Sequence, residues 1–493
     1  MNDAHGEVSP PRQAGPSAGA AQAGAAQASV DAPATSLALC GGTVVTSLDP
    51  VRVVQADVVI AGGRIAAIGE APPGVPRRDC SQTLVLPGNV CAHHHLYSAL
   101  SRGMPYRLAP PRNFLEILQR VWWRLDRALG QTAVRTSALV AGLDALRAGT
   151  TTVIDHHASP NFIDGSLDVI ADALAELGLR SVLCYEVTDR DGASRAEAGV
   201  AENRRFLSRK RRLARGMMGA HASFTLSGET LAACVDAAAA DSVGIHIHVA
   251  EDGADQYDAK ASYGVGVVER LGAAGVLGEA ALLAHCVHVG EPEIAAIAAS
   301  GAAVAHNARS NMNNRVGYSP LTRAGSAPLG SDGSPVPTPR AARVAFGTDG
   351  IGGDMITESQ LAYFRAVEAG AATSPAWSLE RLAEGARIAG RSFGEPLLGQ
   401  ITPGAPADLT VAGYGPPTPL SEANLAGHWV FGLSAQHVRD VIVAGELVIA
   451  DGRSTRVDET KIAEEAAREA VRLWARLDEI PPHPFTPKGR PVS

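Results

Sequence analysis

The side chains best suited to chemistry lie in four short segments rich in histidine or acidic residues. Each follows an apolar run typical of a β-strand, and the segments are His93-His94-His95, His246 to Glu251, His285 to His288 and Gly347 to Gly350. Alternate side chains of a strand share a face, so His93 and His95 can hold one metal ion while His94 points away. Three histidines and an aspartate, with a glutamate and a histidine left free, describe a hydrolytic metal centre with a position open to water.

The central part of the chain, residues 86–398, alternates apolar strand-like runs with alanine-rich helical stretches. Nearly every polar motif falls at the carboxyl end of one of these runs. Eight alternating units over about 310 residues predict a (β/α)8 barrel of TIM type, which gathers its chemistry at that end of its strands. Besides the strand before His93, the expected strands are 151–154, 181–185, 217–220, 244–248, 281–284, 302–305 and 344–347.

Short β-like runs separated by glycine turns flank this central region on both sides. They occupy residues 37–85 and 399–453, and Gly62-Gly63 is typical of a hairpin turn. We expect the two segments to form one small β-sandwich domain, with the α/β barrel inserted between its halves. A C-terminal helix and tail should follow over residues 454–493.

Bulk composition narrows the classes of function. The 493 residues suggest two or three domains, and a formal net charge of −8 without blocks of like charge argues against nucleic acid as a partner. There is no apolar run long enough to span a bilayer and no recognisable signal peptide, so we expect a cytoplasmic protein without membrane attachment. Residues 1–36 are rich in Ala, Gly, Pro, Gln and Ser, and should be disordered.

Seven longer motifs spread over about residues 37–478 carry a family resemblance. They are Pro87 to Gly103, Trp122 to Leu129, Asp155 to Pro160, His246 to Asp252, His306 to Asn314, Gly347 to Met355 and His428 to Ser434. Together they resemble the amidohydrolase superfamily in its deaminase and chlorohydrolase branch, and SsnA-type aminohydrolases most closely. Two features depart from the family, namely the 1–36 extension and a Pro/Gly/Ser-rich insertion at about 321–340, just before the last barrel strand.

The resemblance implies a metal site for one divalent cation. The ligands that it implies are His93, His95, His248 and Asp349. His246 shares a face with His248 on an ideal strand, so spacing alone does not choose between these two histidines. A bridged two-metal site would need a lysine at the end of the fourth strand, where this chain has none. Zn²⁺ suits three histidines and an aspartate best, and Fe²⁺ is the alternative.

The resemblance also implies a deamination, in which metal-bound hydroxide attacks a ring carbon bearing an amino group and ammonia leaves a carbonyl behind. Asp349 would orient the water and take its proton, Glu251 would protonate the adjacent ring nitrogen, and His285 would stabilise the developing charge. The expected partners are water and a heterocycle of the purine, pyrimidine or triazine kind. Candidate substrate-binding residues are His156, His157, His221 and Arg309.

Asp332 could be mistaken for the metal ligand Asp349, because both aspartates lie in similar glycine-flanked segments. A buried strand precedes Asp349, whereas prolines surround Asp332, which favours a turn there. Two other functions stay open at this point. The same site could hydrolyse a C–Cl or N-alkylamine bond, which release of chloride or alkylamine would reveal, or the barrel could be a non-enzymatic scaffold. We expect a homo-oligomer, a dimer or larger.

Overall fold

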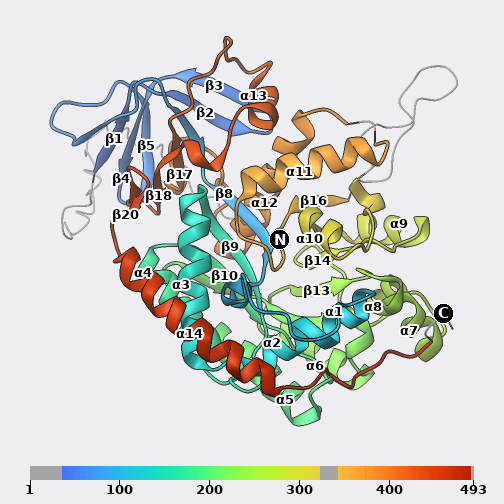
Figure 1. The fold of residues 1–493 in the computed structure, drawn as a ribbon. Helices are drawn as coiled ribbons and strands as arrows, with labels where there is room; N and C mark the ends of the chain where they lie inside the picture. Colours follow the sequence, from blue (N-terminus) through green and yellow to red (C-terminus); the bar gives the residue numbers. More distant parts are fainter. Residues whose placement is uncertain (1–35, 323–341, 372, 490–493) are drawn as a thin grey trace, which may run out of the picture. The chain divides into compact units, whose positions relative to one another are not determined.

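The computed structural model describes residues 36–322, 342–371 and 373–489, whose strands form four sheets (Figure 1). The predicted disorder of residues 1–36 therefore falls almost wholly outside the described residues. The same holds for nearly all of the 321–340 insertion and for Asp332.

Two of the sheets are parallel and contain seven of the eight predicted central strands, together with β8, which carries His93. One has the order β11-β10-β9-β8 and the other β12-β13-β14-β15-β16, and helices follow the strands along the chain. The strands are β8 (Asn89–His94), β9 (Thr150–His157), β10 (Arg180–Tyr185), β11 (Ala214–Gly216), β12 (Met218–Ala222), β13 (Ile245–Val249), β14 (Leu282–His285), β15 (Ala303–His306) and β16 (Arg343–Phe346). The predicted α/β class is confirmed.

Single parallel bridges join the edges of these two sheets, where a continuous barrel sheet was expected. His94 bridges Asp349 at one pair of edges, and Val187 bridges Ala220 at the other. The fourth strand is interrupted at Met217, between β11 and β12, so its two parts pair with different neighbours. This interruption separates the two sheets on one side, and on the other side only the single bridge between His94 and Asp349 joins the edges at β8 and β16.

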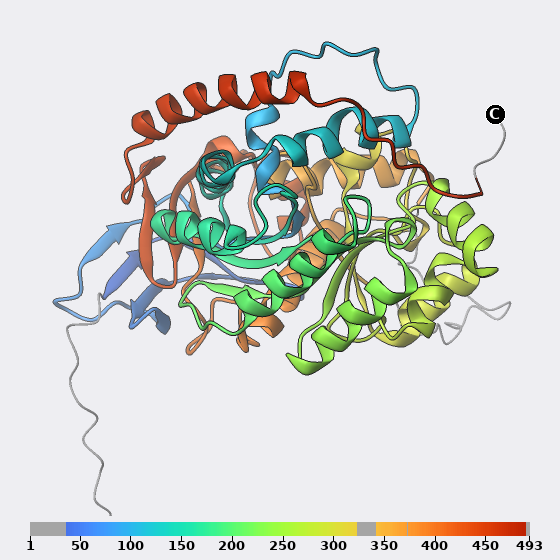
Figure 2. The same ribbon diagram turned by 90° about the horizontal axis from the view of Figure 1, so that it is seen from below.

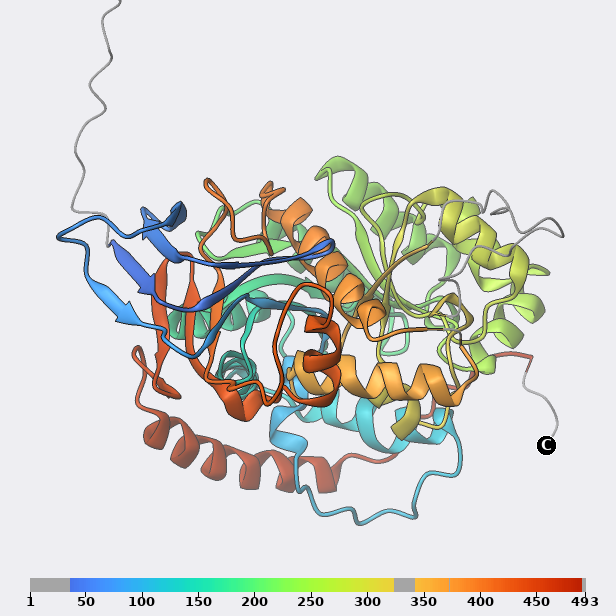
Figure 3. The same ribbon diagram turned by 90° about the horizontal axis from the view of Figure 1, so that it is seen from above.

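The helices bury one apolar face against the parallel strands (Figure 3). In α4 (Ser166–Leu177), buried Leu167, Ile170 and Leu174 recur at helical spacing, and Gly178 ends the helix in the left-handed conformation. The others in this region are α3 (Gln131–Arg147), α5 (Ala193–Leu207), α6 (Gly228–Ala240), α7 (Gly253–Tyr263), α8 (Val267–Ala273), α9 (Glu291–Ser300), α10 (Ala308–Asn313), α11 (Met355–Glu368) and α12 (Ala376–Phe393).

The two flanking segments share one sheet, as expected for a composite domain. Strand β7 (Leu84–Pro87) pairs in parallel with β2 and antiparallel with β17, in a seven-stranded sheet of order β20-β19-β18-β17-β7-β2-β3. A second, four-stranded sheet has the order β5-β4-β1-β6. The remaining bounds are β1 (Leu37–Cys40), β2 (Thr43–Leu48), β3 (Val51–Gln55), β4 (Asp57–Ala61), β5 (Arg64–Gly69), β6 (Arg77–Asp79), β17 (Leu409–Ala412), β18 (Val438–Val443), β19 (Glu446–Ala450) and β20 (Arg453–Ser454).

The apolar run before the histidines belongs to this composite sheet, which corrects the expectation that it forms the strand carrying His93. The chain leaves β7 at Pro87, passes through Gly88 and begins β8 at Asn89. A Cβ atom on Gly88 would lie 2.2 Å from Cγ2 of Thr151, so the crossing needs a residue without a side chain. The run from Asn89 to His94 mixes apolar and polar residues, is buried throughout and forms the strand that carries His93.

Two further segments close off the side of the central region. Helix α1 (Phe114–Ile117), the π-helical turn η2 (Leu118–Trp122) and α2 (Trp123–Ala128) follow one another directly. The predicted C-terminal helix is α14 (Glu459–Glu479), which runs along α2 and α3 (Figure 2). Among the described residues, no helix is both long and apolar enough to cross a membrane.

Candidate active site

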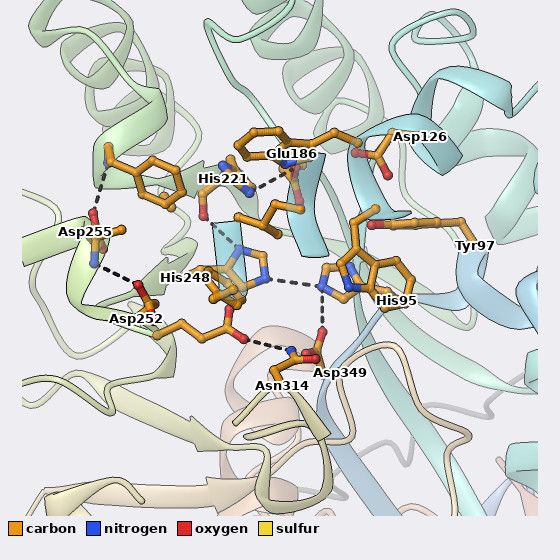
Figure 4. Close-up of a pocket in the computed structure, with 18 residues that line it drawn as sticks. His95, Tyr97, Asp126, Glu186, His221, His248, Asp252, Asp255, Asn314 and Asp349 are labelled. Atoms are coloured by element: carbon orange, nitrogen blue, oxygen red, sulfur yellow. Dashed lines mark hydrogen bonds and ion pairs between the residues drawn. The ribbon is translucent and has the colours of Figure 1, made fainter. Parts of the chain in front are cut away.

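The four predicted metal ligands meet where β8, β13 and β16 end. The ligand atoms of His93, His95, His248 and Asp349 all lie within 4.8 Å of one another. Nε2 of His95 is 3.0 Å from Oδ1 of Asp349 and 3.2 Å from Nε2 of His248 (Figure 4). Nε2 of His93 lies 3.7 Å from the same aspartate oxygen.

Backbone carbonyls fix the tautomers of two of these histidines. Nδ1 of His95 lies 2.6 Å from the carbonyl oxygen of His156, and Nδ1 of His248 lies 2.8 Å from that of His221. A carbonyl oxygen can only accept a hydrogen bond, so both Nδ1 atoms donate. The Nε2 atoms then offer their lone pairs to the shared centre, as metal-binding imidazoles do.

His246 supports His93 and lies outside the cluster of ligand atoms. Its Nε2 is 2.8 Å from Nδ1 of His93, and its Nδ1 is 3.7 Å from Sγ of Cys184. Nε2 of His93 is buried and has no hydrogen-bond partner among the described residues. A cation bound between the four ligand atoms would satisfy this nitrogen, so the residues present fit a divalent metal.

Electrostatics also favour a cation at this centre. Burial lowers the pKa of His93 and of His248 well below the usual value, so both rings are neutral, as ligands must be. Although burial opposes it, the adjacent imidazoles of His93 and His95 hold the pKa of Asp349 well below its usual range. Burial lowers the pKa of His95, but the neighbouring Asp349 outweighs this effect and raises the pKa to about 9. A proton therefore competes with a cation for the ring of His95.

Asp349 adopts a backbone conformation that is uncommon for a residue with a side chain. Its φ is 53°, in the left-handed region, and its N–H donates to the carbonyl oxygen of His93 at 3.1 Å. Gly347 permits the close approach of this turn to β8, because a Cβ there would lie 2.7 Å from Cβ of His93. The turn therefore aims the carboxylate at the histidines.

Glu251 and His285 face each other beside the four ligand atoms. Nε2 of His285 lies 3.5 Å from Oε2 of Glu251 and 3.9 Å from Oδ2 of Asp349. Burial raises the pKa of Glu251 to about 7, although the neighbouring His285 opposes the rise. A carboxyl group with this pKa can both hold and release a proton near neutral pH.

Helix α10 and Asn314, the residue that follows it, supply three supporting side chains that the sequence analysis did not single out. Each contacts one proposed catalytic group: Ser310 Oγ donates to Asp349 Oδ2, Asn311 Oδ1 lies 2.8 Å from Nδ1 of His285, and Asn314 Nδ2 donates to Glu251 Oε1 at 3.2 Å. The signal was present in the quoted motif, because residues one turn apart on a short helix after a strand share a face. One segment thus positions the whole set.

A cavity lies beside the ligand atoms, and His95, His248 and Asp349 form part of its lining. Its wall includes Phe114, Leu118, Trp122, Trp123 and Phe224, which come from α1 to α2 and from the segment after β12. Flat apolar side chains around a few polar groups suit a small aromatic ring.

Of the four predicted substrate-binding residues, His221 reaches this wall and the other three do not. His156 is fully buried, with Nδ1 3.1 Å from Oε2 of Glu186, and His157 is turned toward Ser159. Arg309 forms an ion pair with Glu358 and donates to the carbonyl of Gly352 at 2.7 Å, so it ties two segments together.

Two buried carboxylates on the cavity wall were missed. Glu186 directly follows β10, and Asp126 lies on α2, and both line the cavity. Arg190 lies behind them, with Nη1 2.8 Å from Glu186 and Nη2 2.7 Å from Asp126. Burial raises the pKa of Asp126 to about 8, and Arg190 opposes the rise. The place of Glu186 at the end of a strand was a signal that could have found it.

Replacing Asn314 should reveal its effect on Glu251. In Asn314→Ala, the carboxylate loses a donor that stabilises its charge, so its pKa rises and the fall of activity at alkaline pH moves to higher pH. The measurement is the pH profile of kcat/KM. Met312→Ala, which changes an exposed side chain on α10, serves as the control. An unchanged pH profile of kcat/KM in Asn314→Ala would show that Asn314 does not influence the pKa of Glu251.

The family profile of the amidohydrolases matches residues 84–448. The chain belongs to the amidohydrolase family, which confirms the resemblance and, with it, the expectation of a hydrolase. A 5-methylthioadenosine/S-adenosylhomocysteine deaminase from Desulforudis audaxviator is 30% identical over 436 residues, 85% of this chain and 94% of that protein. A 5'-deoxyadenosine deaminase from Methanopyrus kandleri is 30% identical over 454 residues, 89% of this chain and 99% of that protein.

Two solved structures share the fold. An adenosine deaminase from Xanthomonas campestris with bound zinc has a TM-score of 0.74 at 22% identity, covering 90% of this chain and 99% of that one. An atrazine chlorohydrolase from Arthrobacter aurescens, complexed with zinc, also has a TM-score of 0.74 at 22% identity, covering 88% and 100%. At this identity they show the shared fold alone.

Proposed function

We propose that this protein is a metal-dependent aminohydrolase that deaminates a purine-like ring, with Zn²⁺ as its metal. The observation that carries the proposal is the convergence of three histidine nitrogens and the Asp349 carboxylate within 4.8 Å, with Glu251 beside them. The deaminase names of the relatives support a cyclic amidine with an exocyclic amino group as substrate. Zinc in both structural relatives supports the choice of metal.

The reaction replaces the exocyclic C–N bond of the ring by a carbonyl, with water consumed and ammonia released. A divalent cation held by these residues would lower the pKa of a water molecule at its open coordination position. Asp349 would hold the attacking oxygen in place, accept its first proton and pass it to the amino group, which leaves as ammonia when the C–N bond breaks. The second proton of that oxygen would return to Glu251 as the carbonyl forms. Glu251, protonated at first, gives its proton to the ring nitrogen next to the reacting carbon, and His285 stabilises the charge that develops there.

We further propose how the domains are arranged and that the protein assembles into oligomers. The single bridges at both sheet edges support a (β/α)8 barrel over residues 86–398, and the shared seven-stranded sheet supports a composite β-sandwich domain of residues 37–85 and 399–453. We propose that residues 454–493 form a separate C-terminal segment, which contains α14 and the tail. We also propose a homo-oligomer, which light scattering of the purified protein would test.

Metal content tests the ligand set. Purified protein should hold about one equivalent of divalent metal, and the double variant His93→Ala with His248→Ala should hold almost none, because two of the four ligands are lost. The matched control is His428→Ala with His437→Ala, which removes two partly exposed histidines elsewhere in the chain. Elemental analysis gives the answer. Two tightly bound ions per chain, or full occupancy in the ligand variant, would contradict the proposed centre.

A screen of aminated heterocycles coupled to ammonia detection tests the reaction itself. Release of ammonia from purine-like rings by the metal-loaded protein is the expected result. Chloride or alkylamine release from substituted rings, without deamination, would place the protein with the chlorohydrolases. A metal-loaded protein that hydrolyses none of these bonds would support the scaffold alternative.

A further inference from the structure

A buried series of hydrogen bonds links the proposed metal ligand His93 to the thiol of Cys184. Nδ1 of His93 lies 2.8 Å from Nε2 of His246, and Nδ1 of His246 lies 3.7 Å from Sγ of Cys184. The thiol in turn lies 3.5 Å from the carbonyl oxygen of Asp155 and donates to it. His93, His246 and Cys184 are at most 1% exposed, so each link depends on partners within the protein.

The order of the protons along this series decides whether His93 can bind a metal. Burial lowers the pKa of His93 and of His246 well below the usual value, so each ring is neutral and carries one N–H group. Two arrangements fit the 2.8 Å contact between the rings. When Nδ1 of His93 donates, its Nε2 keeps a lone pair for a cation. When Nε2 of His246 donates instead, the proton of His93 lies on Nε2 and blocks the ligand atom.

The contact between Cys184 and Asp155 selects the first arrangement. Burial raises the pKa of Cys184 well above the usual value, so the sulfur keeps its single proton. A carbonyl oxygen only accepts, so this proton points to Asp155 and leaves the sulfur as an acceptor. Nδ1 of His246 then donates to the sulfur, its only hydrogen-bond partner among the described residues. Nε2 of His246 accepts from His93, whose own Nε2 stays free of a proton.

His93 is the one histidine ligand whose tautomer depends on other side chains, within the part of the protein that the structure describes. Backbone carbonyl oxygens hold Nδ1 of His95 and of His248, and a carbonyl has no proton to rearrange. We propose that Cys184 is a positioning residue of the metal site, which keeps Nε2 of His93 ready for a cation by way of His246. This inference rests on the proposed metal centre. Cys184 lies outside the cavity lining, so the substrate does not touch it.

The affinity for Zn²⁺ tests this role. In Cys184→Ala, the N–H group of His246 loses its acceptor, so the dissociation constant for Zn²⁺ should rise about 10-fold, as is typical when an outer partner of a metal ligand is removed. Cys184→Ser should restore most of the affinity, because a hydroxyl also donates one hydrogen bond and accepts another. Competition with a chromophoric chelator measures the constants.

Cys234→Ala is the matched control. Cys234 on α6 is as fully buried as Cys184, but it belongs neither to the proposed metal cluster nor to the cavity lining. Removing its sulfur should lower the melting temperature and leave the affinity for Zn²⁺ unchanged. A loss of affinity caused by a loosened core alone would appear in both alanine variants.

A second measurement reads the order of the protons directly. NMR of the Zn²⁺-loaded protein with ¹⁵N-labelled histidine reports which ring nitrogen carries the proton. In the unsubstituted protein the proton of His246 should lie on Nδ1, and His246→Asn assigns the signal by its loss. The Nδ1 signal should shift in Cys184→Ser, because oxygen replaces sulfur as the acceptor.

The outcomes separate this inference from the proposed function. An unsubstituted protein without affinity for Zn²⁺ would count against the metal centre itself. With the metal centre intact, the role of Cys184 would be overturned by unchanged affinity in Cys184→Ala, by an equal loss in Cys234→Ala, or by a proton on Nε2 of His246. Equal losses in Cys184→Ala and Cys184→Ser would assign the effect to packing and also overturn it.

Discussion

The Glu251→Gln protein should keep its metal and lose about 10²–10⁴-fold in turnover. Glutamine retains the shape and the hydrogen bonding of the side chain but cannot release a proton to the ring nitrogen. In the unsubstituted enzyme the protonated form of Glu251 acts, and burial raises its pKa to about 7, so activity should fall as the pH rises through this value. The activity of the Glu251→Gln variant should not show this fall with rising pH.

The comparison needs a glutamate of similar burial away from the site. Glu202 on α5 is 2% exposed and accepts from the backbone of Gly165 and Leu167, so Glu202→Gln controls for general destabilisation. Near-normal turnover of Glu251→Gln on a verified substrate would rule out Glu251 as the group that transfers the proton. Loss of metal in that variant would make Glu251 a ligand instead.

Asp349→Asn should abolish turnover, by more than about 10³-fold, and weaken metal binding. An amide supplies neither the negative charge that balances a cation nor a base for the proton of water. The substitution tests chemistry rather than folding, because asparagine is one of the residues that tolerate the left-handed φ of 53° found here. Metal content and ammonia release are measured together.

Asp332→Asn is the matched control for this substitution. Asp332 lies outside the described residues, and its proline-rich surroundings predict a turn without a role at the metal, so metal content and turnover should stay nearly intact. If Asp332→Asn were inactive and Asp349→Asn active, the assignment of the last parallel strand would have to be reversed.

The gathering of the metal-site residues could be predicted because it depends on local rules. Alternation along a strand places His93 and His95 on one face, and parallel strands end at a common edge, where His248 and Asp349 join them. The choice between His246 and His248 could not be made from this alternation, since both share a face. It depends on a contact with His93, which is 153 residues away.

The rest of the site depends on pairs that are remote in the sequence. Arg309 follows the parallel strand β15, as a substrate contact would, but Glu358 forms an ion pair with it from 49 residues away. The link between Asp126 and Arg190 spans 64 residues, so neither carried a local signal. The run 84–86 misled for another reason, because an apolar strand does not reveal which of two adjoining sheets it enters.

The segment after α14 packs behind the aromatic wall of the cavity. Arg124 donates to the carbonyl oxygen of Ile480 at 2.6 Å, and the rings of His483 and Phe485 pack on Trp123, with centroids 5.2 and 5.8 Å away. Residues 480–485, which are synthesised after all four proposed metal ligands, therefore complete the pocket. A nascent chain, or one cut after Glu479, would keep all four of these ligands but lack the support for its aromatic wall. Selectivity for the ring would thus mature after the capacity to hold metal.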